Sequence, residues 1–237
     1  MSGRARSFGR LAAEYDRLRP GYPSEVLRPV VGTVVVDVGA GTGKLSTALA
    51  RSGRRVVAVE PDPEMRSVLV GRGLPGVEVV DGAAERLPVD TGVASAVVYG
   101  QSWHWAEPVA AAAEARRVLV DDGLLLLLSN MPDVSVDWVR ELNRLAGLPE
   151  ELPDVTAFAV EGFTAGPVTR VPWDQSLAVD DLVALFSTFS RVSTREPADR
   201  ERVLRSIRSC LAGHPATAGR EVVAYPYVCV GLPYRRS

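Results

Sequence analysis

The chain has 237 residues, with 27 Lys and Arg against 29 Asp and Glu, which leaves a formal net charge of −2. This balance provides neither the basic surface of a nucleic-acid-binding protein nor the polybasic cluster that attracts a protein to anionic lipid. The two cysteines and two histidines lack the spacing of a metal site or a disulfide framework. No apolar run reaches bilayer length. We therefore expect a cytoplasmic protein that binds neither nucleic acid, membrane nor metal; its oligomeric state is not predicted.

The β-branched run Val34–Val38 predicts a strand buried on both faces, and it leads into the glycine-rich segment 39–43. Glycines allow a tight turn and the close approach of a ligand to the backbone. From Lys44 onward apolar residues recur at helical spacing, so the amides of a helix N-terminus follow the turn. A dinucleotide-binding loop would have glycine in place of Lys44, and a phosphate-binding Walker loop would have glycine in place of Val38 and a hydroxyl residue in place of Leu45. The loop therefore fits neither pattern.

A second apolar strand, Arg55–Glu60, ends in an acid, Glu60. A carboxylate at the tip of this strand can accept hydrogen bonds from both ribose hydroxyls of a bound adenosine. The alternative is an acid that caps the next helix, a role that suits Asp62 better.

The glycine loop followed by Glu60 resembles the first motifs of class I S-adenosylmethionine-dependent methyltransferases, and the likeness extends over nearly the whole chain, with its specific motifs in residues 37–130. It implies an α/β, Rossmann-like, doubly wound fold with a mostly parallel seven-stranded sheet and an antiparallel last strand. It also implies S-adenosyl-L-methionine as the cofactor. The residues expected to bind this cofactor are Tyr15, Arg19, Asp37, Gly39, Ala40, Gly41, Gly43, Glu60, Pro61, Ala83, Ala84 and Gln101.

The chain departs from the family after its third predicted strand, Val77–Val80. The family usually has an acid there that accepts a hydrogen bond from the adenine amino group, and Ala83 stands at the matching position. Adenine binding would then depend on backbone amides and apolar contacts, unless Asp81 or Glu85 reaches across.

Chemistry is expected where the fourth strand, Ala94–Gly100, runs into Gln101–Trp105. Methyl transfer from a sulfonium is an in-line displacement, so alignment and exclusion of water supply much of the catalysis. Trp103 and Trp105 are predicted to stack on the acceptor or to surround the sulfonium through cation–π attraction. His104 is the predicted base for an acceptor that arrives protonated. The alternative is a histidine that shapes the loop through a backbone hydrogen bond and packs on Trp105.

The N-terminal stretch Phe8–Pro23 is too aromatic for a disordered tail. It resembles a segment of trans-aconitate methyltransferase-like proteins that folds over the cofactor cleft. By this resemblance Tyr15, Arg19 and Tyr22 close over the methionine end of the cofactor or over the substrate. The alternative is a helix that packs on the edge of the sheet.

The C-terminal half continues with a fifth strand, an amphipathic helix over Ser135–Ala146 and two late strands, Val168–Leu177 and Val222–Leu232. Two helices, near Val179–Phe189 and Asp199–Leu211, are predicted between the late strands. Phe186 and Arg191, with Tyr22, Trp103 and Trp105, are the predicted substrate-binding residues, and core packing is the alternative for Phe186. We expect one methyltransferase domain over 1–237, with a cap segment (1–30), a cofactor-binding core (31–130) and a substrate-side part (131–237).

These features predict an enzyme that transfers a methyl group from S-adenosylmethionine to an O, N or C nucleophile of a small organic molecule, in specialised metabolism. Two alternatives stay open. One is an enzyme of the same fold that catalyses a different reaction, such as cyclisation. The other is a catalytically inactive paralogue, against which the intact glycine loop and Glu60 argue.

Overall fold

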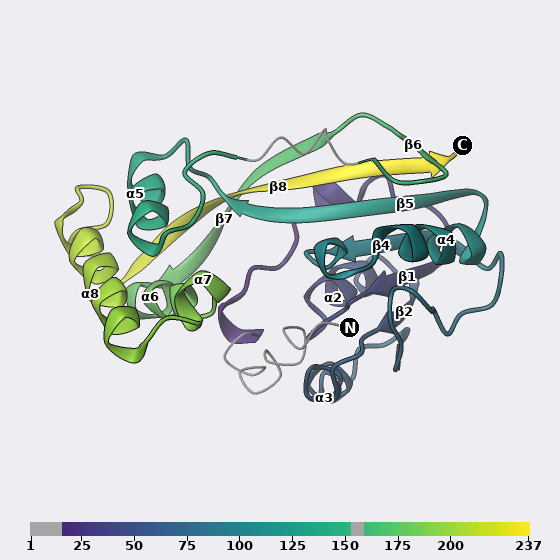
Figure 1. Ribbon diagram of the computed structural model, residues 1–237, viewed down its shortest axis with the longest axis horizontal. Coiled ribbons are helices and arrows are strands. Elements are labelled where there is room, and N and C mark those ends of the chain that lie inside the picture. The colour runs from purple at the N-terminus through teal and green to yellow at the C-terminus, as the bar shows by residue number, and fades with distance from the viewer. Residues whose placement is uncertain (1–15, 153–158) are drawn as a thin grey trace.

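The computed structural model describes residues 16–152 and 159–237, so the predicted site residue Tyr15 lies outside the described part (Figure 1). The strands are β1 (Val34–Val38), β2 (Arg55–Val59), β3 (Val77–Val80), β4 (Ala94–Gly100), β5 (Leu119–Pro132), β6 (Phe163–Ala165), β7 (Thr169–Ala178) and β8 (Val222–Arg236). The helices are η2 (Ser24–Leu27), α2 (Lys44–Ala50), α3 (Pro63–Gly71), η3 (Trp103–Trp105), α4 (Pro108–Val118), α5 (Asp137–Ala146), α6 (Val179–Ser187), α7 (Ser190–Ser193) and α8 (Pro197–Gly213). No helix within these ranges has both the length and the apolar character of a membrane span.

The first five strands form a parallel sheet in the order β3-β2-β1-β4-β5, and β8 lies antiparallel beside β5. The central strand β1 is apolar on both faces because helices cover both. Val36 and Val38 belong to the core that contains α4, whereas Val35 belongs to the core that contains α2. The predicted doubly wound, mostly parallel sheet with an antiparallel last strand is confirmed.

The described sheet has eight strands, one more than predicted, because the sixth strand is interrupted. Both β6 and β7 pair with β8, on either side of residues 166–168. Gly166 N still donates to Pro233 O at 2.8 Å, but Pro167 has no N–H to donate. The pairing shifts by one residue across this gap, from Ala165 opposite Tyr234 to Thr169 opposite Gly231. The two pieces keep the position of a single sixth strand.

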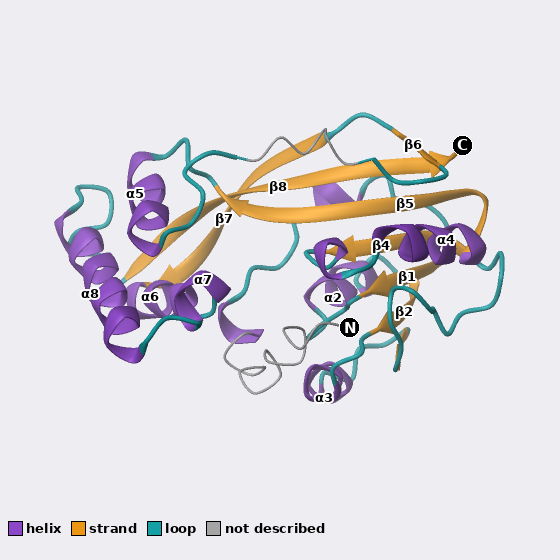
Figure 2. Cartoon of the chain, viewed as in Figure 1, coloured by secondary structure: helices purple, strands orange, loops and turns teal. Residues whose placement is uncertain are grey.

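Beyond the parallel sheet, β7 and β8 continue together as a long two-stranded ribbon (Figure 2). An isolated ribbon is at best marginally stable, and here α5, α6 and α8 pack on its far end. In α8 the buried residues Val203, Ile207 and Leu211 recur every four positions, which gives the helix one apolar face toward the ribbon. We call α5–α8 with this end of the ribbon the helical half, and the parallel sheet with α2–α4 the sheet half.

Candidate active site

Two cavities lie at the carboxyl ends of β1, β2 and β4, which is where open α/β sheets bind their ligands. The large cavity, of about 560 Å³, reaches from the sheet half to the helical half. Its lining residues are Arg19, Val38, Gly39, Gly41, Glu60, Pro61, Met65, Ala83, Ala84, Glu85, Tyr99, Gly100, Gln101, Ser102, His104, Trp105, Ala106, Leu148, Pro149, Phe189, Ser190 and Arg191. The small cavity, of about 110 Å³, lies beside the glycine loop and shares Arg19, Gly39, Gly41, Gly100, Gln101 and Phe189 with the large one.

The glycine loop keeps space open at one position and packs tightly at another. Gly41 has φ of 58°, and a Cβ built there would meet nothing nearer than Met65 Sδ at 3.7 Å. A side chain would therefore fill the cavity as well as strain the backbone. Gly43, the N-cap of α2, has φ of 89°, and a Cβ there would lie 2.2 Å from Leu69 Cδ1. Gly41 thus leaves room for a ligand, whereas the predicted cofactor residue Gly43 lines neither cavity and allows α2 to pack closely on Leu69.

Glu60 is buried at the end of β2, and its carboxylate is held by two backbone amides. Gly41 N donates to Oε2 and Asp62 N donates to Oε1, each at 2.8 Å. Burial raises the pKa of Glu60, although these two hydrogen bonds act in the opposite direction. Each carboxylate oxygen retains a second lone pair, so the fixed carboxylate can also accept from the hydroxyls of a ribose.

Unpaired buried polar atoms surround the small cavity. Asp37 accepts from Ser46 Oγ at 2.6 Å through Oδ2, while its buried Oδ1 has no hydrogen-bond partner in the described part of the chain. Thr42 Oγ1 is buried and has no partner there either. Burial raises the pKa of Asp37 to about 7, and the nearby Glu60 carboxylate adds to the rise. With Arg19 on the same wall, the small cavity matches the ammonium and carboxylate of an amino acid.

A strained residue closes the end of β4. Gln101 has φ of 60°, a left-handed conformation that is rare outside glycine and often found at functional sites. Its Nε2 donates to Asn130 O at 2.6 Å. The buried Asn130 side chain in turn donates to Gly21 O at 2.7 Å and accepts from Trp173 Nε1 at 3.1 Å. These bonds fix β4, β5, β7 and the N-terminal segment relative to one another around the cavities.

His104 and Trp105 lie on the wall of the large cavity, with ring centroids 4.7 Å apart. Desolvation by the surrounding wall lowers the pKa of His104, so the imidazole is a neutral acceptor near neutral pH. Its ring makes no hydrogen bond to any residue that the structure describes, although loop shaping would call for one. Trp103, predicted to bind substrate, instead packs edge-on against Tyr99 with centroids 4.9 Å apart, because η3 turns it toward the sheet core.

The helical half supplies the opposite wall. Arg19 lies over the Phe189 ring at 4.5 Å and donates to Thr188 O at 3.0 Å. Arg191 lines the cavity and donates to Gly147 O at 3.1 Å. Phe186, predicted to bind substrate, is fully buried in the core of the helical half, in keeping with the core-packing alternative. Phe189, and not Phe186, lines the cavity.

The structure therefore gathers most of the predicted residues around the two cavities. The large cavity brings together Arg19, Gly39, Gly41, Glu60, Pro61, Ala83, Ala84, Gln101, His104, Trp105 and Arg191. The small cavity adds Asp37, Ala40 and Tyr22, the last packed against Gly100 beside the glycine loop and away from the large cavity.

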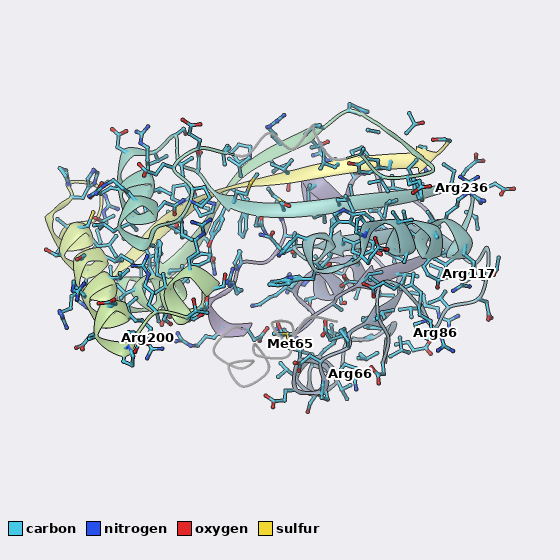
Figure 3. All side chains as sticks on the ribbon, in the orientation of Figure 1. Met65, Arg66, Arg86, Arg117, Arg200 and Arg236 are labelled. Atoms are coloured by element: carbon cyan, nitrogen blue, oxygen red, sulfur yellow. The ribbon has the colours of Figure 1, made fainter. Side chains whose placement is uncertain are left out.

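Several lining residues were not predicted. Met65, labelled beside α3 in Figure 3, is the third residue of that helix, for which the sequence predicted only an acid cap at its start. Leu148 and Pro149 follow α5 in a segment without periodicity, and Tyr227 reaches the small cavity from β8. Tyr99 lies in the predicted fourth strand, where the sequence does not distinguish a tyrosine that lines a cavity from one that packs in the core.

Comparison with known proteins agrees with this site. Residues 36–127 match the family model described as a methyltransferase domain. Over 227 residues the chain is 39% identical to an uncharacterised methyltransferase of Mycobacterium tuberculosis, which covers 94% of this chain and 93% of that one. The chain is a class I S-adenosylmethionine-dependent methyltransferase. This methyltransferase is also 26% identical over 239 residues to an uncharacterised methyltransferase of Schizosaccharomyces pombe, with 95% of each chain covered.

Solved structures share the fold of this methyltransferase. A structure described as a type II methyltransferase from Anaeromyxobacter dehalogenans superposes with a TM-score of 0.69 at 21% identity, covering 92% of this chain and 97% of that one. A methyltransferase structure from Bacillus halodurans gives a TM-score of 0.53 at 18% identity, covering 90% and 97%. The cofactor that the family implies fits the residues present. Gly41 leaves space open, and Asp37 Oδ1 and Thr42 Oγ1 have no partner among the described residues where the amino-acid end of the cofactor would lie.

Proposed function

We propose that this methyltransferase uses S-adenosylmethionine to methylate an O, N or C nucleophile of a small organic molecule. The observation that carries the proposal is the continuity of the large cavity from Gly41 and Glu60, through His104 and Trp105, to Arg191. A volume of about 560 Å³ suits a cofactor beside a small acceptor, since pockets for small molecules commonly measure roughly 300–1,000 Å³. The finer assignments, to a trans-aconitate methyltransferase-like group and to the cytoplasm, stay predictions.

When bound, the cofactor supplies a methyl group on a cationic sulfur: its carbon–sulfur bond breaks as the bond to the acceptor forms, and sulfur keeps the electron pair. The protein's own residues position the acceptor and keep water out of the site. The fixed loop 101–105 holds one wall, while Trp105 and Phe189 shield the reacting atoms from water. His104 takes the proton of a hydroxyl or ammonium acceptor on an unprotonated imidazole nitrogen.

The charges on the wall favour an acceptor that carries an anionic group. The acids that line the large cavity, Glu60 and Glu85, come from the sheet half. The cations Arg19 and Arg191 face the same space from the other side, beside the apolar residues Leu148 and Phe189. An apolar molecule with a carboxylate near Arg191 satisfies both kinds of surface.

The test is to incubate the protein with S-adenosylmethionine labelled on the methyl group and with fractionated metabolite pools, and to follow the label. We expect label in a small apolar product, mainly from fractions retained by an anion exchanger. Consumption of the cofactor without a labelled product would support the alternative reaction, such as cyclisation. Absence of both consumption and binding would support an inactive paralogue.

A further inference from the structure

The adenine side of the large cavity lacks the acid that the family has there, because Ala83 stands in its place. Ala83, Ala84 and Glu85 line the cavity beside Pro61. Arg86 N donates to Ala83 O at 3.1 Å, which closes a tight turn with Ala84 and Glu85 at its centre. This turn brings a different carboxylate to the cavity.

The two nearby acids differ in where they lie. Asp81 is on the surface, with 74% of its side chain exposed, and its Oδ1 lies 3.0 Å from Arg66 Nη1. Arg66 of α3 is itself half-buried and also donates to Glu60 O at 2.7 Å. Asp81 does not line the large cavity. Glu85 does line it, and its Oε1 accepts from Glu107 N at 2.9 Å, just before α4. This bond fixes the carboxylate, while no described residue donates to Oε2.

A second polar group on the same wall has no partner. Tyr99 is 1% exposed, its hydroxyl makes no hydrogen bond within the described residues, and it lines the large cavity. Burial raises the pKa of Tyr99, and the charges of Glu85 and Glu114 raise it further, so the hydroxyl keeps its proton. Because a buried hydroxyl without a partner is costly, this donor calls for a ligand atom.

We propose that Glu85 and Tyr99 together recognise the amino edge of adenine. Adenine presents a donor, its exocyclic amino group, beside an acceptor, a ring nitrogen. The Glu85 carboxylate accepts from the amino group, and the Tyr99 hydroxyl donates to the ring nitrogen. The inference rests on the proposed use of S-adenosylmethionine. In it, Glu85 takes the role of the acid that is missing at position 83.

The experiment is calorimetric titration with S-adenosylhomocysteine and with its deaminated analogue, in which an oxo group replaces the amino group. The native protein should prefer the adenosyl ligand by about tenfold or more, since hydrogen bonds to charged groups are the strong ones. Glu85→Gln should lose most of this preference, because an amide can turn its N–H₂ toward the oxo group. Tyr99→Phe should bind the adenosyl ligand several-fold more weakly, and the matched control Asp81→Asn should behave as the native protein.

Glu85→Gln keeps a carbonyl oxygen for Glu107 N, and thermal melting checks that each variant is folded. A native preference retained in Glu85→Gln would overturn the inference, as would a preference lost in Asp81→Asn alone. If the native protein binds neither ligand, the proposed function itself fails. Binding of the adenosyl ligand with no preference over the oxo analogue would overturn only the inference.

Discussion

At the residue scale, the buried carboxyl group of Asp37 links cofactor binding to stability. Its Oδ1 has no partner in the described structure, and burial raises its pKa to about 7. The folded protein therefore binds a proton at this site that the unfolded chain has released between about pH 4 and pH 7. It follows that the free energy of unfolding declines as pH rises through this window.

Asp37→Asn should consequently stabilise the protein at pH 8 by about 1–4 kcal/mol while weakening its binding of S-adenosylhomocysteine. The amide needs no proton to be neutral and still accepts from Ser46 Oγ, but it cannot pair with the ammonium of the ligand. Denaturant unfolding at pH 5 and pH 8, with calorimetry at pH 8, measures both effects. Equal unfolding free energies of the two proteins at pH 8 would contradict this account of Asp37.

His104→Gln separates the role of a base from that of a loop residue. With an acceptor identified by the label experiment, we expect kcat to fall by about 10²–10⁴-fold for a hydroxyl or ammonium nucleophile. In the native enzyme the lowered pKa keeps the imidazole unprotonated to a lower pH than an ordinary histidine, so kcat/KM should decline only below about pH 6.5. The variant should lose this acid limb and keep its affinity for S-adenosylhomocysteine. A kcat within a few-fold of native, with the same pH profile, would leave His104 the loop-shaping role.

At the scale of elements, the sequence predicted the sheet better than the walls of the cavities. The ranges of β1, β3 and β4 are those expected, because short apolar runs bounded by turn residues have few other readings. Helical periodicity likewise located α5, α6 and α8. Periodicity does not say what each side chain of a helix packs against. It could not separate Phe186, which lies in the core, from Phe189, which lines the cavity three residues later. Leu148 and Pro149 come from a segment without any period.

The N-terminal segment 16–22 spans both halves. Asp16 pairs with Lys44 at 3.7 Å on the glycine-loop side. Leu18 is fully buried in the core of the helical half, and its carbonyl accepts from Gln175 Nε2 at 3.0 Å. Leu18 thus packs on the helical half and not on the edge of the sheet that the alternative names, while Arg19 lines both cavities.

Leu18→Ala should undock this segment, because emptying a buried leucine site costs about 2–5 kcal/mol. We expect faster amide exchange over residues 16–22 and faster dissociation of S-adenosylhomocysteine in stopped-flow measurements, since Arg19 lines both cavities. Arg17→Ala is the control: it removes a surface ion pair with Asp181 and should change little. A native dissociation rate in Leu18→Ala would mean that the segment does not hold the ligand in.

At the scale of the whole molecule, the sheet half and the helical half meet at the active site. The sheet half buries its cores on the two faces of the parallel sheet, and the helical half buries its own on the far end of the β7–β8 ribbon. Figure 1 shows α6–α8 and α2–α4 on opposite sides of the N-terminal segment. The residues expected to bind the cofactor come mainly from the sheet half, and the helical half supplies the opposite wall of the large cavity. We therefore expect that acceptor choice can vary without disturbing the cofactor loop.

Phe186→Ala tests this division. The side chain is fully buried among residues of the helical half, including Tyr225, and truncation of such a phenylalanine costs about 3–5 kcal/mol. We expect amide exchange to rise over residues 179–213 while residues 34–60 stay protected, and S-adenosylhomocysteine to bind within a few-fold of native affinity. Leu126→Ala, which empties a buried site on β5, is the matched control and should raise exchange in the sheet half instead. If Phe186→Ala loosens both halves equally and abolishes binding, the two cores unfold as one unit, and the separation of cofactor and acceptor sides does not extend to stability.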